Sequence, residues 1–200
     1  MIYKSLSNPK LTASFKEAAT TGIAPDRGLY FPDHLPVLGK SFWSSYATME
    51  KKELGFEVMK HFVGNDIDKD TLAEIAFSAI DFDLPVVRLG DHMGVLELFH
   101  GPTLAFKDVG ARFMARCLGY FSAQNGEKTT VLVATSGDTG GAVADGFLGV
   151  SGVEVVILYP SGKVSPLQEK QLTALGQNIK AIEVLGSFDD CQEMVKTAFV

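Results

Sequence analysis

The stretch that decides the fold runs from residue 129 to 184 and reads TTVLVATSGDTGGAVADGF, LGVSGVEVVILYPSGKV, SPLQEKQLTALGQNIKAIEV. It alternates β-branched apolar runs, which are typical of strands buried on both faces, with segments of helical spacing. We expect strands at 129–135, 153–158 and 179–184, helices at 140–147 and 166–175, and a further helix from about Ser187. Such alternation predicts right-handed βαβ crossovers and an α/β fold: an open, mainly parallel sheet with helices on both faces.

One of these helices has well-marked ends. Ser165 is the expected N-cap, Pro166 occupies the first turn, and Gln168 stands where the partner of a capping box belongs. Gly176 follows the expected end of the helix, as in many left-handed caps.

The regions that precede this alternation have a different texture. Residues 1–84 are interrupted by prolines and then contain two helical patterns, at 54–64 and at 72–80 after the cap candidate Asp68, so we expect a small, mostly helical N-terminal region. Residues 85–200 begin with a predicted hairpin, its strands at 86–89 and 95–99. A long amphipathic helix follows, from Phe106 to the stop signal Asn125-Gly126, and its spacing assigns Asp108, Arg112 and Arg116 to the face opposite the apolar stripe.

The composition excludes several classes of protein. The 200 residues contain 18 Lys and Arg against 24 Asp and Glu, a net charge of −6, and no stretch concentrates cations as a nucleic-acid binder does. No apolar run approaches the length of a membrane span. Cys117 and Cys191 stand far apart and without metal-ligand spacing, so neither a disulfide framework nor a metal site is expected. We expect a cytoplasmic protein with no nucleic-acid or membrane partner. The sequence does not indicate its oligomeric state.

The loop after the first strand of the alternation is the strongest candidate for a binding site. Ser136, Gly137, Asp138 and Thr139 stand between a buried strand and a helix, where parallel α/β sheets bind ligands. Hydroxyl groups, close backbone approach at glycine and the positive end of a helix dipole together favour a carboxylate or a phosphate. The spacing matches neither the dinucleotide fingerprint nor the P-loop. The alternative is a plain turn in which Ser and Thr only cap the helix.

Lys107 is the second candidate, because it stands at the start of the long helix. A helix N-terminus disfavours a cationic ammonium and thereby favours the neutral amine that attacks an aldehyde. The adjacent Asp108 acts in the opposite direction. The alternative is an ordinary surface lysine. His100 is a weaker candidate, through its position alone.

Three motifs in order resemble the threonine synthase family, among the fold-type-II enzymes that depend on pyridoxal 5′-phosphate (PLP). They are residues 100–108 (HGPTLAFKD), residues 136–140 (SGDTG) and residues 22–32 (GIAPDRGLYFP). The resemblance covers almost the whole chain. It implies an N-terminal threonine-synthase-like region at 1–84 and the first part of the PLP-binding catalytic domain at 85–200.

The resemblance also implies a chemistry and its residues. Lys107 carries PLP covalently, Asp138 binds the cofactor, and Ser136, Gly137 and Thr139 bind the substrate. Asp138 replaces the asparagine that is common in the wider superfamily and matches this branch. The implied reaction converts O-phospho-L-homoserine and water to L-threonine and phosphate, with no metal.

Two features of the superfamily are not recognisable in this sequence, namely the glycine-rich loop for the PLP phosphate and the Ser or Thr that faces the pyridine nitrogen. We therefore expect an N-terminal portion of a longer enzyme, inactive by itself. Two other functions stay open: a PLP-dependent serine or threonine dehydratase or phospholyase, and a non-catalytic α/β module that binds anions.

Overall fold

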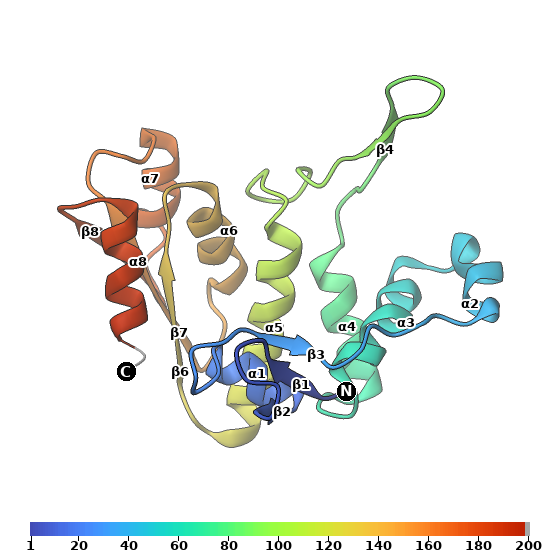
Figure 1. Cartoon of the computed structure of the whole chain (residues 1–200). Coiled ribbons are helices and arrows are strands. Elements are labelled where there is room, and N and C mark those ends of the chain that lie inside the picture. The colour runs from blue at the N-terminus through green and yellow to red at the C-terminus, as the bar shows by residue number, and fades with distance from the viewer. Residues whose placement is uncertain (199–200) are drawn as a thin grey trace. The chain divides into compact units, whose positions relative to one another are not determined.

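The computed structural model describes residues 1–198 and divides into two compact units, Met1–Asp81 and Phe82–Val200 (Figure 1). The first unit combines helices with a small sheet. Its elements are β1 (Tyr3–Ser5), β2 (Thr12–Ala13), α1 (Phe15–Thr21), β3 (Tyr30–Pro32), α2 (Lys40–Ser45), the 3-10 helix η1 (Tyr46–Thr48), α3 (Lys51–Val63) and α4 (Lys69–Ala79).

Both predicted helices of the first unit are confirmed. Asp68 caps α4 by accepting a hydrogen bond from the Thr71 backbone N–H at 3.0 Å. Gly64 ends α3 with a φ of 66°, a conformation that favours glycine. The antiparallel sheet β2-β1-β3 was not predicted, because strands of two or three residues are too short to show a period.

The motif at residues 22–32 forms a tight turn on this sheet. The buried Ser5 hydroxyl donates to the Asp26 carboxylate at 2.8 Å, and the same carboxylate accepts from the Gly28 backbone N–H at 3.0 Å. A side chain at Gly28 would overlap Ser5 Oγ, so this position requires glycine. The motif therefore builds a fixed turn in the first unit.

The second unit contains the predicted hairpin and the predicted parallel sheet. Strands β4 (Val86–Arg88) and β5 (Gly94–Leu96) pair antiparallel and are followed by α5 (Asp108–Asn125). The remaining elements are β6 (Thr129–Ala134), α6 (Asp138–Phe147), β7 (Val153–Pro160), α7 (Pro166–Thr173), β8 (Ile179–Val184) and α8 (Phe188–Thr197). The strand order β6-β7-β8 and the parallel pairing confirm the predicted sheet.

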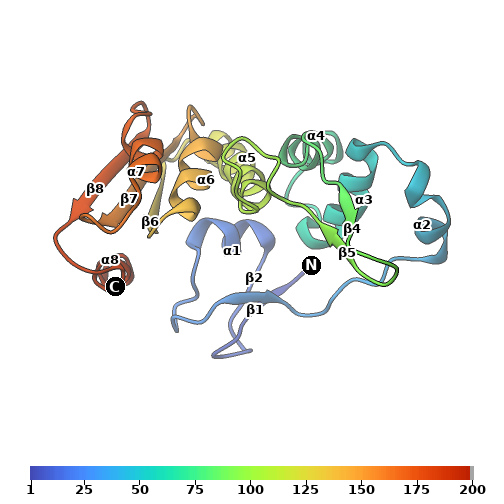
Figure 2. The ribbon, with the colours of Figure 1, turned by 90° about the horizontal axis from the view of Figure 1, so that it is seen from above.

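Helices cover both faces of this sheet. Figures 1 and 2 show α8 on one side of β7 and α6 on the other. Helices α5 and α6 pack almost backbone to backbone, since a Cβ at Gly146 would lie 3.2 Å from the carbonyl carbon of Ala111. Arg116 Nη1 also donates to the Gly146 carbonyl at 3.1 Å. This close packing joins the first turns of α5, which follow Lys107, to the C-terminal end of α6, the helix that begins at Asp138.

Two local predictions need correction. Ser165 does cap α7, but the Gln168 side chain does not complete a capping box: its Oε1 accepts from the Ser165 hydroxyl instead of from the Ser165 backbone N–H. Asp108 was expected on the polar face of α5, yet it is 1% exposed. The turn that precedes α5 folds over the Asp108 carboxylate. The spacing of apolar residues along a helix does not predict a contact with the preceding turn.

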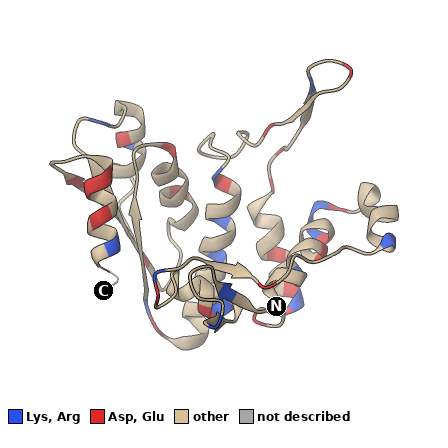
Figure 3. Ribbon diagram, viewed as in Figure 1, with Lys and Arg blue, Asp and Glu red and all other residues tan. Residues whose placement is uncertain are grey.

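The described residues, 1–198, contain no helix long and apolar enough to cross a membrane. Acidic and basic residues are interspersed in both units (Figure 3). Cys117 and Cys191 are free thiols in the interior, and burial raises the pKa of Cys117 to about 12. Buried thiols of this kind behave as small apolar side chains.

Candidate active site

Lys107 occupies the N-cap position of α5, one residue before the helix begins. Its side chain is 32% exposed, so the amine is within reach of a ligand. Its Nζ lies over the Phe106 ring, 4.5 Å from the ring centre. A cation over an aromatic face is stabilised by the ring's negative potential.

The turn that leads to Lys107 is closed by the buried Asp108 carboxylate. One oxygen accepts from the Thr103 backbone N–H at 2.9 Å, and the other accepts from the Thr103 hydroxyl. Gly101 makes room for this arrangement, since a Cβ there would lie 2.5 Å from Asp108 Oδ2. Lys107 is therefore attached to a turn that is held from within.

The loop after β6 is closed by a single hydroxyl. Thr135, which is buried, accepts from the backbone N–H of Gly137 at 3.2 Å and of Gly140 at 2.9 Å. A Cβ at Gly140 would lie 2.5 Å from Thr135 Cγ2, so glycine is needed for this close contact. The sequence suggested glycines for ligand approach; the structure also requires them for packing.

The predicted substrate-binding residues lie together at the start of α6. Ser136 is exposed, Thr139 is half-buried and Gly137 is buried as the N-cap. Within residues 1–198, the backbone N–H groups of Ser136, Asp138 and Thr139 make no hydrogen bond. A helix N-terminus with free N–H groups and neighbouring hydroxyls can bind an anion.

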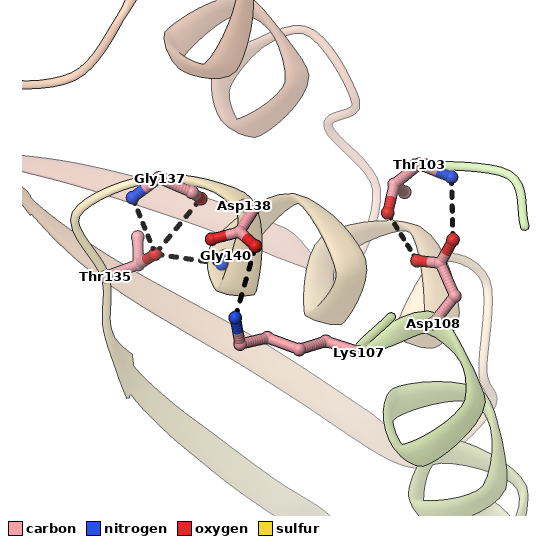
Figure 4. A network of polar contacts seen from close by, with 7 residues as sticks. All are labelled: Thr103, Lys107, Asp108, Thr135, Gly137, Asp138 and Gly140. Atoms are coloured by element: carbon pink, nitrogen blue, oxygen red, sulfur yellow. Dashed lines mark hydrogen bonds and ion pairs between the residues drawn. The ribbon is translucent and has the colours of Figure 1, made fainter. Parts of the chain in front are cut away.

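The two candidate sites meet at an ion pair, which Figure 4 shows from close by. Lys107 Nζ lies 3.1 Å from Asp138 Oδ2, although 31 residues separate them in the sequence. The carboxylate suits the positive end of the α6 dipole. The structure thus brings together Lys107, Asp138 and the substrate-binding candidates.

The sequence did not assign Thr103, Thr135 or Phe106. A Thr that ends a strand before Ser-Gly is a detectable signal for Thr135, but no local pattern marks the other two. His100 bonds Glu97 through Nε2 at 2.7 Å and stacks on Phe99, and both of these partners precede the turn that leads to Lys107.

The residues present fit PLP, the cofactor implied by the resemblance. An aldehyde cofactor needs a reachable primary amine, which Lys107 provides. Its partners should include hydrogen-bond donors next to that amine, and the start of α6 offers hydroxyl and backbone donors beside Asp138.

Comparison with known families agrees with this geometry. Residues 2–80 match the model "Threonine synthase N terminus", and residues 87–199 match the model "Pyridoxal-phosphate dependent enzyme". Threonine synthase of Escherichia coli strain K12 is 45% identical over 186 residues, which are 93% of this chain and 43% of the relative. Threonine synthase of Saccharomyces cerevisiae is 38% identical over 220 residues, covering 99% of this chain and 43% of the relative.

Solved structures agree as well. The crystal structure of Escherichia coli threonine synthase superposes with a TM-score of 0.89 at 42% identity, covering 100% of this chain and 46% of that one. The PLP-bound threonine synthase of Brucella melitensis gives 0.90 at 38% identity, covering 100% and 44%. The chain thus spans less than half the length of these proteins. Since the second family model matches more than half of its residues, the chain belongs to the pyridoxal-phosphate-dependent enzyme family.

Proposed function

We propose that this chain is part of a threonine synthase, which converts O-phospho-L-homoserine and water to L-threonine and phosphate. The observation that supports it most is the ion pair between Lys107 Nζ and Asp138 Oδ2, at 3.1 Å, which joins two motifs that are distant in the sequence. Similarity to threonine synthases over 93–98% of the chain gives independent support.

Lys107 has two roles in the proposal. Its amine holds PLP covalently, and once the substrate's amine has replaced it, it moves protons at the substrate's Cα and Cβ. PLP, when bound, supplies an electron sink for the negative charge that develops at these carbons. The Phe106 ring and the Asp138 carboxylate, which both contact the amine, keep it at the site between these tasks.

The start of α6 binds the substrate. The hydroxyls of Ser136 and Thr139 orient the substrate carboxylate, and Gly137, which has no side chain, lets it approach the free N–H groups at the positive end of the helix dipole. Asp138 binds the cofactor beside Lys107. Holding the carboxylate fixes the orientation of Cα toward the Lys107 amine, which is the main contribution that positioning makes to rate.

The test uses the natural protein that contains these 200 residues, loaded with PLP and given O-phospho-L-homoserine. We expect L-threonine and phosphate to be released in equal amounts. Lys107→Ala should lose the visible absorption band and the borohydride-trapped PLP on this residue, whereas the matched variant Lys128→Ala, at an exposed lysine, should keep both. Ketoacid release in place of threonine would indicate a dehydratase or phospholyase. Anion binding without any trapped PLP would indicate a non-catalytic module.

A cytoplasmic location is part of the proposal. The free, buried thiols of Cys117 and Cys191 support it, because unpaired cysteines are usual in a reducing compartment. Fractionation of cells that express the natural protein tests this directly.

A further inference from the structure

The turn before Lys107 contains a strained residue. Leu104 has a φ of 60°, in the left-handed region that non-glycine residues rarely occupy, and its side chain is 74% exposed. An exposed side chain gains little from burial that would offset this strain. The conformation must therefore be imposed by the contacts of its neighbours.

The side-chain contacts of this turn come from one pair of residues. Thr103, which directly precedes Leu104, donates its backbone N–H and its hydroxyl to the two oxygens of Asp108. Backbone hydrogen bonds continue on either side: the Leu104 N–H donates to Gly101 at 3.1 Å, and the Asp108 N–H donates to Ala105 at 3.0 Å. Leu104 and Lys107 both lie inside the loop that the Thr103 and Asp108 side chains close.

Water cannot take the place of the protein groups that donate hydrogen bonds to the Asp108 carboxylate. Asp108 is 1% exposed, and the missing Cβ of Gly101 is what allows it to approach the turn. A buried carboxylate is strongly disfavoured unless hydrogen-bond donors satisfy it, so the two Thr103 donors are required for its burial. Loss of one donor should loosen the whole turn.

We propose that Thr103 and Asp108 form a clamp that positions Lys107 for the cofactor. They are positioning residues, since neither of them contacts the Lys107 amine in the contacts described. The clamp holds Leu104 in its left-handed conformation and thereby sets the direction in which the main chain presents Lys107 to Asp138. The inference rests on the proposed function in one respect, namely that Lys107 is the residue that carries PLP.

The main test compares Thr103→Val with Thr103→Ser. Valine keeps the shape of threonine and removes the hydroxyl donor, whereas serine keeps the donor. Ser122→Ala is the matched control: the buried Ser122 hydroxyl donates to Gly152 at 2.9 Å and to Glu127, near the opposite end of α5, so its loss should destabilise the protein without reaching Lys107.

The first readout needs no cofactor. In the natural protein stripped of PLP, lysines are acylated briefly with an N-hydroxysuccinimide ester, and the Lys107 to Lys128 labelling ratio is measured by mass spectrometry. We expect Thr103→Val to raise this ratio about threefold, the change that corresponds to losing one exposed ion pair. Thr103→Ser and Ser122→Ala should stay at the wild-type ratio.

The second readout is spectroscopic. We expect Thr103→Val to retain PLP about tenfold less well, with an altered visible band, because small misplacements of a reacting group have large effects. Thr103→Ser should restore both. Asp108→Asn, which keeps one acceptor for the Thr103 N–H, should give a smaller change in the same direction.

These outcomes separate the two proposals. If the wild-type protein takes up no PLP at Lys107, the proposed function fails, while the labelling ratios still judge the clamp. An unchanged ratio in both Thr103→Val and Asp108→Asn overturns the clamp, and so does an equal rise in Ser122→Ala, since that rise would reflect general destabilisation.

Discussion

Two turns of the second unit carry the candidate chemistry, and they are held in different ways. The turn before Lys107 is closed by a buried charge, Asp108, and it contains the strained Leu104. The loop before Asp138 is closed by a neutral hydroxyl, that of Thr135, and by Gly140, which packs against the Thr135 side chain. The first turn should therefore store backbone strain, and the second should be sensitive both to added volume and to loss of its hydroxyl.

The largest effect is expected from Gly140→Ala. The new Cβ would lie 2.5 Å from Thr135 Cγ2 and 2.8 Å from Leu172 Cδ2, in a packed interior that cannot yield easily. We expect a loss of about 3 kcal/mol in the free energy of unfolding, measured by urea denaturation. Gly110→Ala is the control, because nothing lies within 4 Å of its Cβ in α5, and it should stabilise by about 0.5 kcal/mol. Equal effects at the two glycines would contradict the packing argument.

Removing the hydroxyl of the second turn should have the next largest effect. Thr135→Val leaves the buried Gly137 backbone N–H without its acceptor, and it leaves the Gly140 N–H with only its 3.2 Å bond to the Gly137 carbonyl. We expect a loss of about 2 kcal/mol, because one buried donor is left unsatisfied and a second loses its shorter hydrogen bond. Thr135→Ser keeps the acceptor and should lose less, chiefly through its missing methyl group. A serine variant as unstable as the valine variant would show that the methyl, not the hydroxyl, holds this loop.

The strain in the first turn can be measured with two substitutions at one position. Leu104→Gly and Leu104→Ala remove the same exposed side chain, but only glycine adopts a φ of 60° without penalty. We expect the glycine variant to be more stable than the alanine variant by about 1 kcal/mol, the usual penalty for a left-handed L-residue. At an unstrained position the order is reversed, so an alanine variant at least as stable would mean that the turn stores no strain.

The hydroxyl cap at Ser187, before α8, shows what such a group contributes outside the site, where Ser187 is half-buried and its partner Asp190 is exposed. It accepts from the Asp190 backbone N–H at 3.2 Å, and its own backbone and hydroxyl donate to the Asp190 carboxylate, lowering the pKa of that group. We expect Ser187→Ala to lower the stability by about 0.5 kcal/mol at neutral pH.

The pH dependence of this cap has a definite sign. The pKa of Asp190 is lowered by folding, so the carboxylate stabilises the protein above its unfolded pKa and loses this effect as the pH falls through the folded value. The difference between wild type and Ser187→Ala should therefore shrink in acid. An NMR titration of the Asp190 carboxyl checks it, and a pKa that is the same in both proteins would refute the assignment.

The comparison of the two turns also explains what a sequence can predict. Residues 179–184 were predicted as a strand and form β8 with the same bounds, because an apolar β-rich run between a Gly turn and a cap is a local signal. The candidate site at residues 136–139 also follows from a local signal, namely small and hydroxyl-bearing residues between a predicted strand and a predicted helix. The burial of Asp108 was missed, since helical spacing placed it on the polar face and the contact with Thr103 depends on how the preceding turn folds.

The short distance between the two turns could not be predicted from local sequence patterns either. Lys107 and Asp138 are brought together by the packing of α5 on α6, in which Gly146 allows close approach. Helical periods predict which residues share a face, but they do not predict which helix packs there. The resemblance to a known family associated the two motifs, whereas their 3.1 Å separation is a property of the tertiary structure.

The smallest effect on stability is expected where the two turns meet. Asp138→Asn removes the ion pair with Lys107. The Asp138 side chain is 56% exposed and the Lys107 side chain 32%, and ion pairs that face water contribute little to stability. We expect the free energy of unfolding to change by less than about 0.5 kcal/mol, with the difference disappearing at 1 M salt. The same variant should change the visible band of bound PLP, because Asp138 is the proposed cofactor contact. A large loss of stability would mean that the pair holds the two turns together and that Asp138 has a structural role. A negligible loss with a changed spectrum would leave the cofactor as the reason for a carboxylate at this position.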